Sequence, residues 1–179
     1  GGLLAIRENE CHLLSMDEHN IPEIDLWVVN LYPFERIIEK NDDASQIIEN
    51  IDIGGPAMIR AGAKNYKYVS VIVDQQDYDT LLNELDQNSG CTTEHFRRRL
   101  AEIAFARTAE YDGFISTWMN KKAGNKEPRR LIISGEHKKN LRYGENPHQS
   151  ASYYQTNRSS DILVSSKLHQ GKQLSYNNL

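Results

Sequence analysis

The chain has 179 residues, of which 39% are hydrophobic, 8% aromatic and 26% charged, and its formal net charge is −4. This composition is typical of a soluble globular protein. It excludes a membrane-spanning one, because no apolar run approaches the ~18–20 residues that a membrane helix needs. Two cysteines cannot build a disulfide framework and no signal peptide is present, so we expect a reduced, cytoplasmic setting. Because the sequence begins at Gly1 without Met and ends at Leu179 without a closing element, we expect a piece of a longer protein.

The charge is unevenly distributed along the chain. Residues 1–120 hold 10 Lys and Arg against 21 Asp and Glu, whereas residues 121–142 hold eight basic and two acidic residues. The acidic first part argues against a broad nucleic-acid surface, which requires a basic face. The basic stretch lacks interleaved aromatic residues, which favours a solvated linker or helix end. The alternative is an RNA- or protein-binding segment.

The predicted elements alternate between strands and helices. The run Ile24–Tyr32 combines apolar and β-branched residues and is ended by Pro33, as in a buried strand of a parallel sheet. Asp42 and Asp43 are both candidates to cap the second of the helices that follow. The other expected elements are helices over Phe34–Lys40 and Ala44–Asn50, an extended piece over Ile51–Ile53, a helix over Ala57–Lys64, a strand over Tyr68–Val73, a helix over Asp77–Asp86 and a long helix over Thr93–Trp118.

This alternation predicts an α/β fold with a mostly parallel sheet. The composition turns polar between residues 121 and 128, so we expect a domain boundary there. The first domain would span residues 1–130, and residues 131–179 would begin a second one. This second segment is too short to form a hydrophobic core of its own.

The segment Ile51–Asn65 holds the most informative motif. Asp52 stands at the end of an extended piece, and Gly54 and Gly55 let the backbone approach a ligand closely where a helix begins. The free N–H groups and the positive end of the helix dipole can hold an anion or a developing oxyanion there. The alternative is a tight turn in which Asp52 caps the helix. The residues alone leave both interpretations open.

Two further motifs are rich in polar groups. Asn30 and Tyr32 follow the first predicted strand, at the edge where open α/β sheets bind ligands, although a strand-ending turn would also explain them. Arg142 can bind a phosphate or carboxylate with two hydrogen bonds, and His148 can titrate near neutral pH, although a polar turn between domains has a similar composition. The remaining histidines show no ligand spacing, so we expect no metal site.

Five motifs occur in one order along the chain: NLYPF, IDIGGP-x-MIRA-x-AKN, TA-x-YD, LRYGENPHQ and GK-x-LSYNN. Together they resemble the bifunctional purine-biosynthesis enzymes that combine AICAR transformylase with IMP cyclohydrolase. The resemblance covers nearly all of the chain. It implies that the first part is a cyclohydrolase domain with a methylglyoxal-synthase-like α/β fold, here without its N-terminal strands. The second part would begin the transformylase domain.

The resemblance also implies the site residues. Tyr32, Asp52 and Lys64 fall on positions that line the cyclohydrolase site. Arg142 and Tyr143 fall on positions that contact AICAR in the transformylase site. The positions that contact the cyclohydrolase nucleotide are Asn30, Leu31, Gly54 and Gly55.

The implied substrates are the purine ribonucleotides formyl-AICAR, IMP and AICAR. The cyclohydrolase reaction would need no metal or cofactor, and 10-formyltetrahydrofolate would be the co-substrate of the transformylase. The resemblance further implies a homodimer, with no nucleic acid and no membrane as partner.

Ring closure of formyl-AICAR suits these residue types. The carboxamide nitrogen and the formyl carbonyl belong to one molecule, so orientation supplies much of the rate. Asp52 can accept the amide proton as a general base. Lys64, Tyr32 and the backbone of Gly54 and Gly55 can stabilise the oxygen that departs as water.

One geometric condition applies to this assignment. A straight helix over residues 55–64 places Lys64 about 13 Å along the axis from the helix start. Lys64 therefore meets Asp52 only if the helix is bent or interrupted, which Gly62 would favour.

Other residues that the family uses fall outside this sequence. The resemblance implies that a lysine and a phosphate-binding loop would precede Gly1 and that the Lys-His pair of formyl transfer would lie beyond Leu179. We therefore expect no transformylase activity from this chain. For the cyclohydrolase reaction two outcomes stay open. Either the residues present suffice for catalysis, or the chain is only a scaffold that carries half of the active site. The alternatives are a non-catalytic nucleotide- or anion-binding regulatory domain, which would have no reason to carry LRYGENPHQ, and an interaction segment over residues 121–142.

Overall fold

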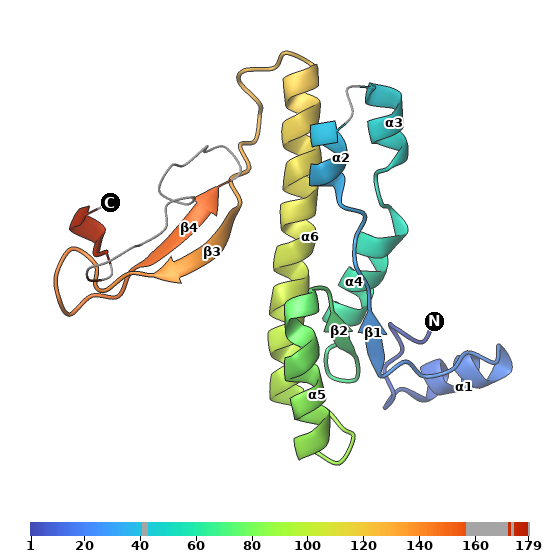
Figure 1. The fold of residues 1–179 in the computed structure, drawn as a ribbon. Helices are drawn as coiled ribbons and strands as arrows, with labels where there is room; N and C mark the ends of the chain where they lie inside the picture. The colour runs from blue at the N-terminus through green and yellow to red at the C-terminus, as the bar shows by residue number, and fades with distance from the viewer. Residues whose placement is uncertain (41–42, 157–171, 173, 179) are drawn as a thin grey trace. The chain divides into compact units, whose positions relative to one another are not determined.

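Figure 1 shows the chain as a computed structural model, which describes residues 1–40, 43–156, 172 and 174–178. The chain divides into two compact units, Gly1–Lys126 and Glu127–Leu179. No helix in the described ranges is both long and apolar enough to cross a membrane.

The first unit contains a small parallel sheet. Strand β1 (Leu26–Val28) pairs with β2 (Ser70–Ile72) in the register Leu26 to Ser70 and Val28 to Ile72. This mixed α/β arrangement confirms the predicted class. Both strands are shorter than predicted. The expectation that β1 is buried on both faces was wrong: Leu26 and Val28, which share one face of the strand, are 40% and 46% exposed.

The described part of the first unit also contains six helices. One of them, α1 (Glu10–Glu18), was not predicted, because it buries only Met16 and has almost no apolar stripe. Its one sequence signal is Asn9, whose side chain caps it by accepting the N–H of His12. The others are α2 (Phe34–Lys40), α3 (Ala44–Glu49), α4 (Gly54–Lys64), α5 (Tyr78–Gln87) and α6 (Glu94–Lys122), with a 3₁₀ turn at Gln75–Asp77.

Caps explain where several of these helices begin. Asp43 caps α3 by accepting the N–H of Ser45, as predicted, whereas Asp42 lies outside the described residues. Thr93 caps α6 in the same way through Phe96. Helix α4 begins at Gly54, three residues before the predicted start at Ala57, and Pro56 is its third residue.

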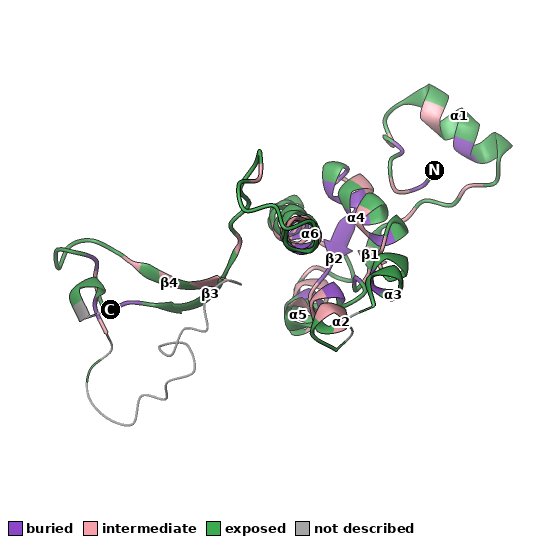
Figure 2. Cartoon of the chain, turned by 90° about the horizontal axis from the view of Figure 1, so that it is seen from above, coloured by how far each residue is buried: buried purple, intermediate pink, exposed green. Residues whose placement is uncertain are grey.

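Helices α4 and α6 pack against each other and against β2, whose three residues are all buried (Figure 2). Gly62 permits this approach, because a Cβ there would lie 2.6 Å from Cγ2 of Val71. Gly62 does not interrupt the helix: α4 is continuous, and the glycine instead lets the helix lie close to the sheet.

An aromatic cluster joins α2 to α6. The ring of Phe34 meets Tyr111 edge-on at a centroid distance of 6.1 Å, and Trp118 at 6.0 Å. Phe34 and Tyr111 are completely buried. Such edge-to-face pairs contribute about 0.5–1.5 kcal/mol beyond the area that they bury. The NLYPF and TA-x-YD motifs thus meet in the core.

Helices α5 and α6 are linked by a carboxylate. Glu84 Oε1 accepts the backbone N–H of Thr93 at 2.8 Å and its hydroxyl at 2.6 Å. Hydrogen bonds from Thr93 lower the pKa of Glu84 below its ordinary value. The stabilisation is therefore present above the ordinary glutamate pKa and is lost as the pH falls through the lowered pKa of the folded state.

We expect Glu84→Gln to destabilise the first unit at neutral pH, with a difference from the parent chain that shrinks as the pH falls below the ordinary glutamate value. Denaturant unfolding at a series of pH values measures this difference. Glu49→Gln, at an exposed position near the end of α3, is the matched control. A Glu84→Gln difference that stays constant down to strongly acidic pH would contradict the assignment.

The second unit contains an antiparallel hairpin. Strand β3 (Gly135–Asn140) pairs with β4 (Ser152–Thr156), with an irregularity between His137 and Lys139. A 3₁₀ turn spans Tyr176–Asn178. The polar sequence of β3 gave no strand signal, and the apolar run Leu131–Ile133 before it is exposed.

Candidate functional site

The loop after β1 holds three of the predicted site residues. Asn30 Nδ2 donates to the hydroxyl of Tyr78 at 3.4 Å, which ties the loop to the start of α5. Leu31 is buried in the core, whereas Tyr32 is 58% exposed. Asn30 and Tyr32 are thus exposed polar residues on either side of the buried Leu31.

The start of α4 holds Asp52 in a defined turn. Its Oδ1 accepts the backbone N–H of Gly55 at 2.8 Å, and its own N–H donates to the hydroxyl of Tyr111 at 2.8 Å. The carboxylate therefore caps α4 from two residues before its first residue. This explains the early helix start, since the cap satisfies an N–H group that has no partner within the helix. The capping interpretation of Asp52 is thus shown, and its chemistry toward a ligand stays a proposal.

The two glycines of this turn differ in their surroundings. A Cβ on Gly55 would lie 2.5 Å from Asp52 Oδ2 and 2.8 Å from Leu31 Cδ2. A Cβ on Gly54 would meet only Met58, at an ordinary 3.9 Å. Gly55 therefore brings Leu31 and Asp52 together, while Gly54 is exposed at the mouth of the turn.

Lys64 lies at the other end of the same helix. It is the last residue of α4 and is exposed. At 1.5 Å per residue it stands about 15 Å along the axis from Gly54. The structure thus brings Leu31, Asp52 and Gly55 into contact and places Lys64 away from them.

A charged group lies on α6, one turn before Tyr111. Arg107 pairs with Glu110 at 2.9 Å and with Glu35 of α2 at 3.3 Å. Burial lowers the pKa of Arg107, but the two carboxylates raise it by more, so its guanidinium stays charged. Burial raises the pKa of Tyr111, because it disfavours the charged phenolate, and the hydroxyl therefore stays neutral at ordinary pH.

The second unit brings two of the motifs together. The N–H of Arg142 donates to the carbonyl of Leu174 at 2.9 Å, and that of Tyr176 to the carbonyl of Tyr143 at 3.1 Å. Residues from LRYGENPHQ and LSYNN, about 30 positions apart, are therefore neighbours. The guanidinium of Arg142 lies 4.7 Å from the centroid of the Tyr143 ring and donates to its hydroxyl at 3.0 Å.

The hydroxyl of Tyr143 has two polar partners. Hydrogen bonds with Ser175 and with Arg142 lower the pKa of Tyr143. A cleft of about 680 Å³ lies beside the pair, lined by residues of the same two motifs and by their neighbours Ser150 and Ala151. His148 lines this cleft, while Arg142 and Tyr143 are not among its lining residues.

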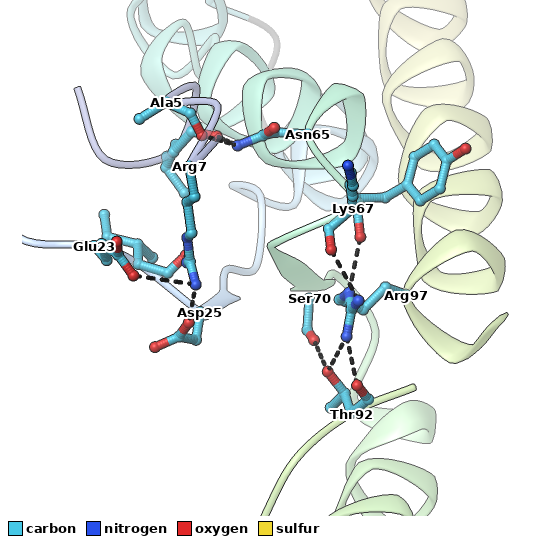
Figure 3. Close-up of polar contacts among 12 residues, drawn as sticks. Ala5, Arg7, Glu23, Asp25, Asn65, Lys67, Ser70, Thr92 and Arg97 are labelled. Atoms are coloured by element: carbon cyan, nitrogen blue, oxygen red, sulfur yellow. Dashed lines mark hydrogen bonds and ion pairs between the residues drawn. The ribbon is translucent and has the colours of Figure 1, made fainter. Parts of the chain in front are cut away.

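A second cleft, of about 710 Å³, lies near the amino ends of the strands and was missed by the sequence analysis. Figure 3 shows the polar contacts around it: Arg7 with Glu23 and Asp25, and Arg97 with Lys67 and Thr92. Another lining residue, Lys67, pairs with Glu8 at 2.6 Å. These cations are therefore already neutralised or hydrogen-bonded, which favours a structural role.

Arg97 holds this region together. Its Nε donates to the carbonyl of Tyr66 at 2.9 Å, its Nη2 to that of Lys67 at 2.8 Å, and its Nη1 to the carbonyl and hydroxyl of Thr92. A lysine cannot span these acceptors, because its donors sit on one nitrogen.

We expect Arg97→Lys to lower the unfolding free energy by about 1–3 kcal/mol, since carbonyls are left without partners. The matched control is Arg98→Lys, because the Arg98 side chain is 69% exposed and pairs only loosely with Glu102 at 3.7 Å. Denaturant unfolding of both variants measures the difference, and equal effects would contradict the bracing role of Arg97.

No three His, Cys, Asp or Glu side chains gather as metal ligands within the described residues.

Comparison with known proteins identifies the family. The family model described as AICARFT/IMPCHase bienzyme matches residues 62–179, and the chain belongs to this family. The chain is 52% identical, over all 179 residues, to the bifunctional purine biosynthesis protein PurH of Ruegeria sp. (strain TM1040). It is also 52% identical to PurH of Paracoccus denitrificans (strain Pd 1222). It covers 34% of each of these proteins, so it spans about a third of the length of its curated relatives.

A solved structure shares the fold. The structure titled "Crystal structure of ForH" matches with a TM-score of 0.55 and 38% sequence identity. The match covers 64% of this chain and 60% of the ForH chain.

Proposed function

We propose that this chain is the cyclohydrolase part of a bifunctional purine-biosynthesis enzyme, followed by the beginning of its transformylase part. The reaction would be the closure of formyl-AICAR to IMP with loss of water. The observation that carries the proposal is the turn at the start of α4, where the carboxylate of Asp52 accepts the N–H of Gly55 and lies, like the buried Leu31, close to that glycine. Membership of the family supports it.

The proposed chemistry uses both sides of this turn. The nucleotide would lie against Asn30, Leu31, Gly54 and Gly55, with its carboxamide nitrogen beside Asp52. The capping hydrogen bond engages Oδ1 and fixes the carboxylate, which leaves Oδ2 to accept the amide proton.

The departing oxygen needs a donor as it gains negative charge. The exposed side chain of Tyr32 and the N–H of Gly54 would donate to it. Lys64 is proposed as a site residue that acts from the opposite end of α4, on another part of the nucleotide. This division follows from the length of the unbroken helix.

The other expectations are part of the same proposal. Residues 1–130 would form a methylglyoxal-synthase-like cyclohydrolase domain, and residues 131–179 would begin the transformylase domain. There Arg142 and Tyr143 would contact AICAR, which is formylated by 10-formyltetrahydrofolate in the longer protein. The longer protein would be a cytoplasmic homodimer.

The proposal is tested by mixing the chain with formyl-AICAR and following IMP formation by ultraviolet absorbance, with circular dichroism confirming that the chain is folded. The expected result is a rate above the uncatalysed background that saturates with substrate. A folded chain that gives only the background rate would contradict the proposal that the residues present here carry the reaction.

A further inference from the structure

A buried hydroxyl on α6 has no part in the chemistry proposed above. Tyr111 is completely buried, and its hydroxyl lies 2.8 Å from the backbone nitrogen of Asp52, from which it accepts a hydrogen bond. The two residues are 59 positions apart, so only the tertiary fold brings them together. The Asp52 N–H thus has a buried tyrosine hydroxyl as its partner, on a helix that is itself packed into the core.

The same tyrosine ring also holds the other segment of the candidate site. Its edge-on contact with Phe34, at a centroid distance of 6.1 Å, fixes the residue that ends NLYPF. Tyr111 therefore contacts both segments that supply the site, one through its ring and one through its hydroxyl. Any displacement of Tyr111 would move the Asp52 turn and the NLYPF loop together.

Three contacts then continue from Tyr111 to the carboxylate. The Asp52 N–H is held by Tyr111, the Asp52 Oδ1 accepts from Gly55, and the absent Cβ of Gly55 leaves room for Oδ2 and for Leu31. A buried N–H that loses its partner costs free energy, so the turn would shift to find another acceptor. A shift of about 1 Å in a catalytic group is enough to slow a reaction substantially.

We propose that Tyr111 is a positioning residue, whose hydroxyl sets the orientation of the Asp52 carboxylate toward the substrate. This inference rests on the proposed function for its substrate, but the geometry that it describes is measurable without any reaction. Tyr111 itself touches neither the nucleotide nor the reacting atoms.

The test compares Tyr111→Phe with Tyr66→Phe in the full 179-residue chain. Both variants keep an aromatic ring against the same core, and no hydrogen bond of the Tyr66 side chain is found among the described residues. Amide hydrogen exchange read by NMR is the first measurement. In Tyr111→Phe the Asp52 amide should exchange at least about tenfold faster than in the parent chain, after correction for any change shared by the amides of α6. The amide resonance of Gly55 should also shift. Tyr66→Phe should change neither.

Ring-closure kinetics are the second measurement. In Tyr111→Phe we expect kcat to fall about tenfold or more while KM stays within about twofold, because the reacting group and not the nucleotide contact is misplaced. Merely loosened packing would leave the kcat of the folded fraction unchanged. The inference is overturned if the exchange rate of the Asp52 amide changes only as much as the rates of the α6 amides, or if kcat is unchanged in a folded variant. An inactive parent chain refutes the proposed function alone, and the exchange at Asp52 then decides the inference.

Discussion

Gly55→Ala is expected to destabilise the first unit by about 1–3 kcal/mol, the usual cost of forcing an extra methyl into a packed site. The new Cβ would meet Asp52 Oδ2 at 2.5 Å and Leu31 Cδ2 at 2.8 Å, and neither atom can withdraw without losing a contact. Oδ2 belongs to the carboxylate that caps α4, and Leu31 is buried. The variant should therefore lose stability although alanine is the better helix former.

Gly54→Ala is the matched control, one residue earlier in the same helical turn. Its Cβ would meet only Met58 Cε at 3.9 Å, so we expect no loss and a gain of up to about 1 kcal/mol from reduced backbone freedom in the unfolded chain. Denaturant unfolding of both variants measures the two effects. Equal effects at the two positions would contradict the close approach of Leu31 and Asp52 at Gly55.

Asp52→Asn is expected to slow ring closure by about 10²–10⁴-fold, the usual contribution of a general base. It should change stability little, because the amide oxygen of asparagine can accept the N–H of Gly55 as the carboxylate does, and asparagine is as good a cap as aspartate. This variant separates the two interpretations of Asp52. A residue that only caps the helix would be replaced by asparagine with no loss of rate.

Asp43→Asn is the control for Asp52→Asn. Asp43 caps α3 by accepting the N–H of Ser45 and is not among the proposed site residues. It should keep both full activity and full stability. Ring-closure rates and denaturant unfolding of the two variants give the comparison. An equal rate for Asp52→Asn and Asp43→Asn would remove the base assignment.

The sequence contained much of this site, since NLYPF and IDIGGP were each identified as candidate binding segments. Leu31, Asp52 and Gly55 do meet there. The cap on α4 was one of two open interpretations of Asp52, because a short carboxylate before a helix suits either role. The sequence also showed that Lys64 can meet Asp52 only if the helix between them is bent or interrupted. Helix α4 is continuous, so the two residues lie at opposite ends of it.

Other features had no local signal. The contact between Tyr111 and Asp52 joins positions 59 residues apart, and a tyrosine at a core spacing of a helix gives no sign that its hydroxyl has a partner. The role of Arg97 was hidden because Arg97, Arg98 and Arg99 together look like a solvated helix face. Only the fold shows that one of them turns toward backbone carbonyls.

The central claim is that a purine nucleotide binds where β1 ends and α4 begins. An NMR titration of the ¹⁵N-labelled chain with IMP tests it most directly. The account predicts saturable shifts of the amides of Asn30, Tyr32, Gly54 and Gly55, with those around Arg97 unmoved. Shifts confined to the cleft beside Arg97, or none up to millimolar IMP, would contradict it.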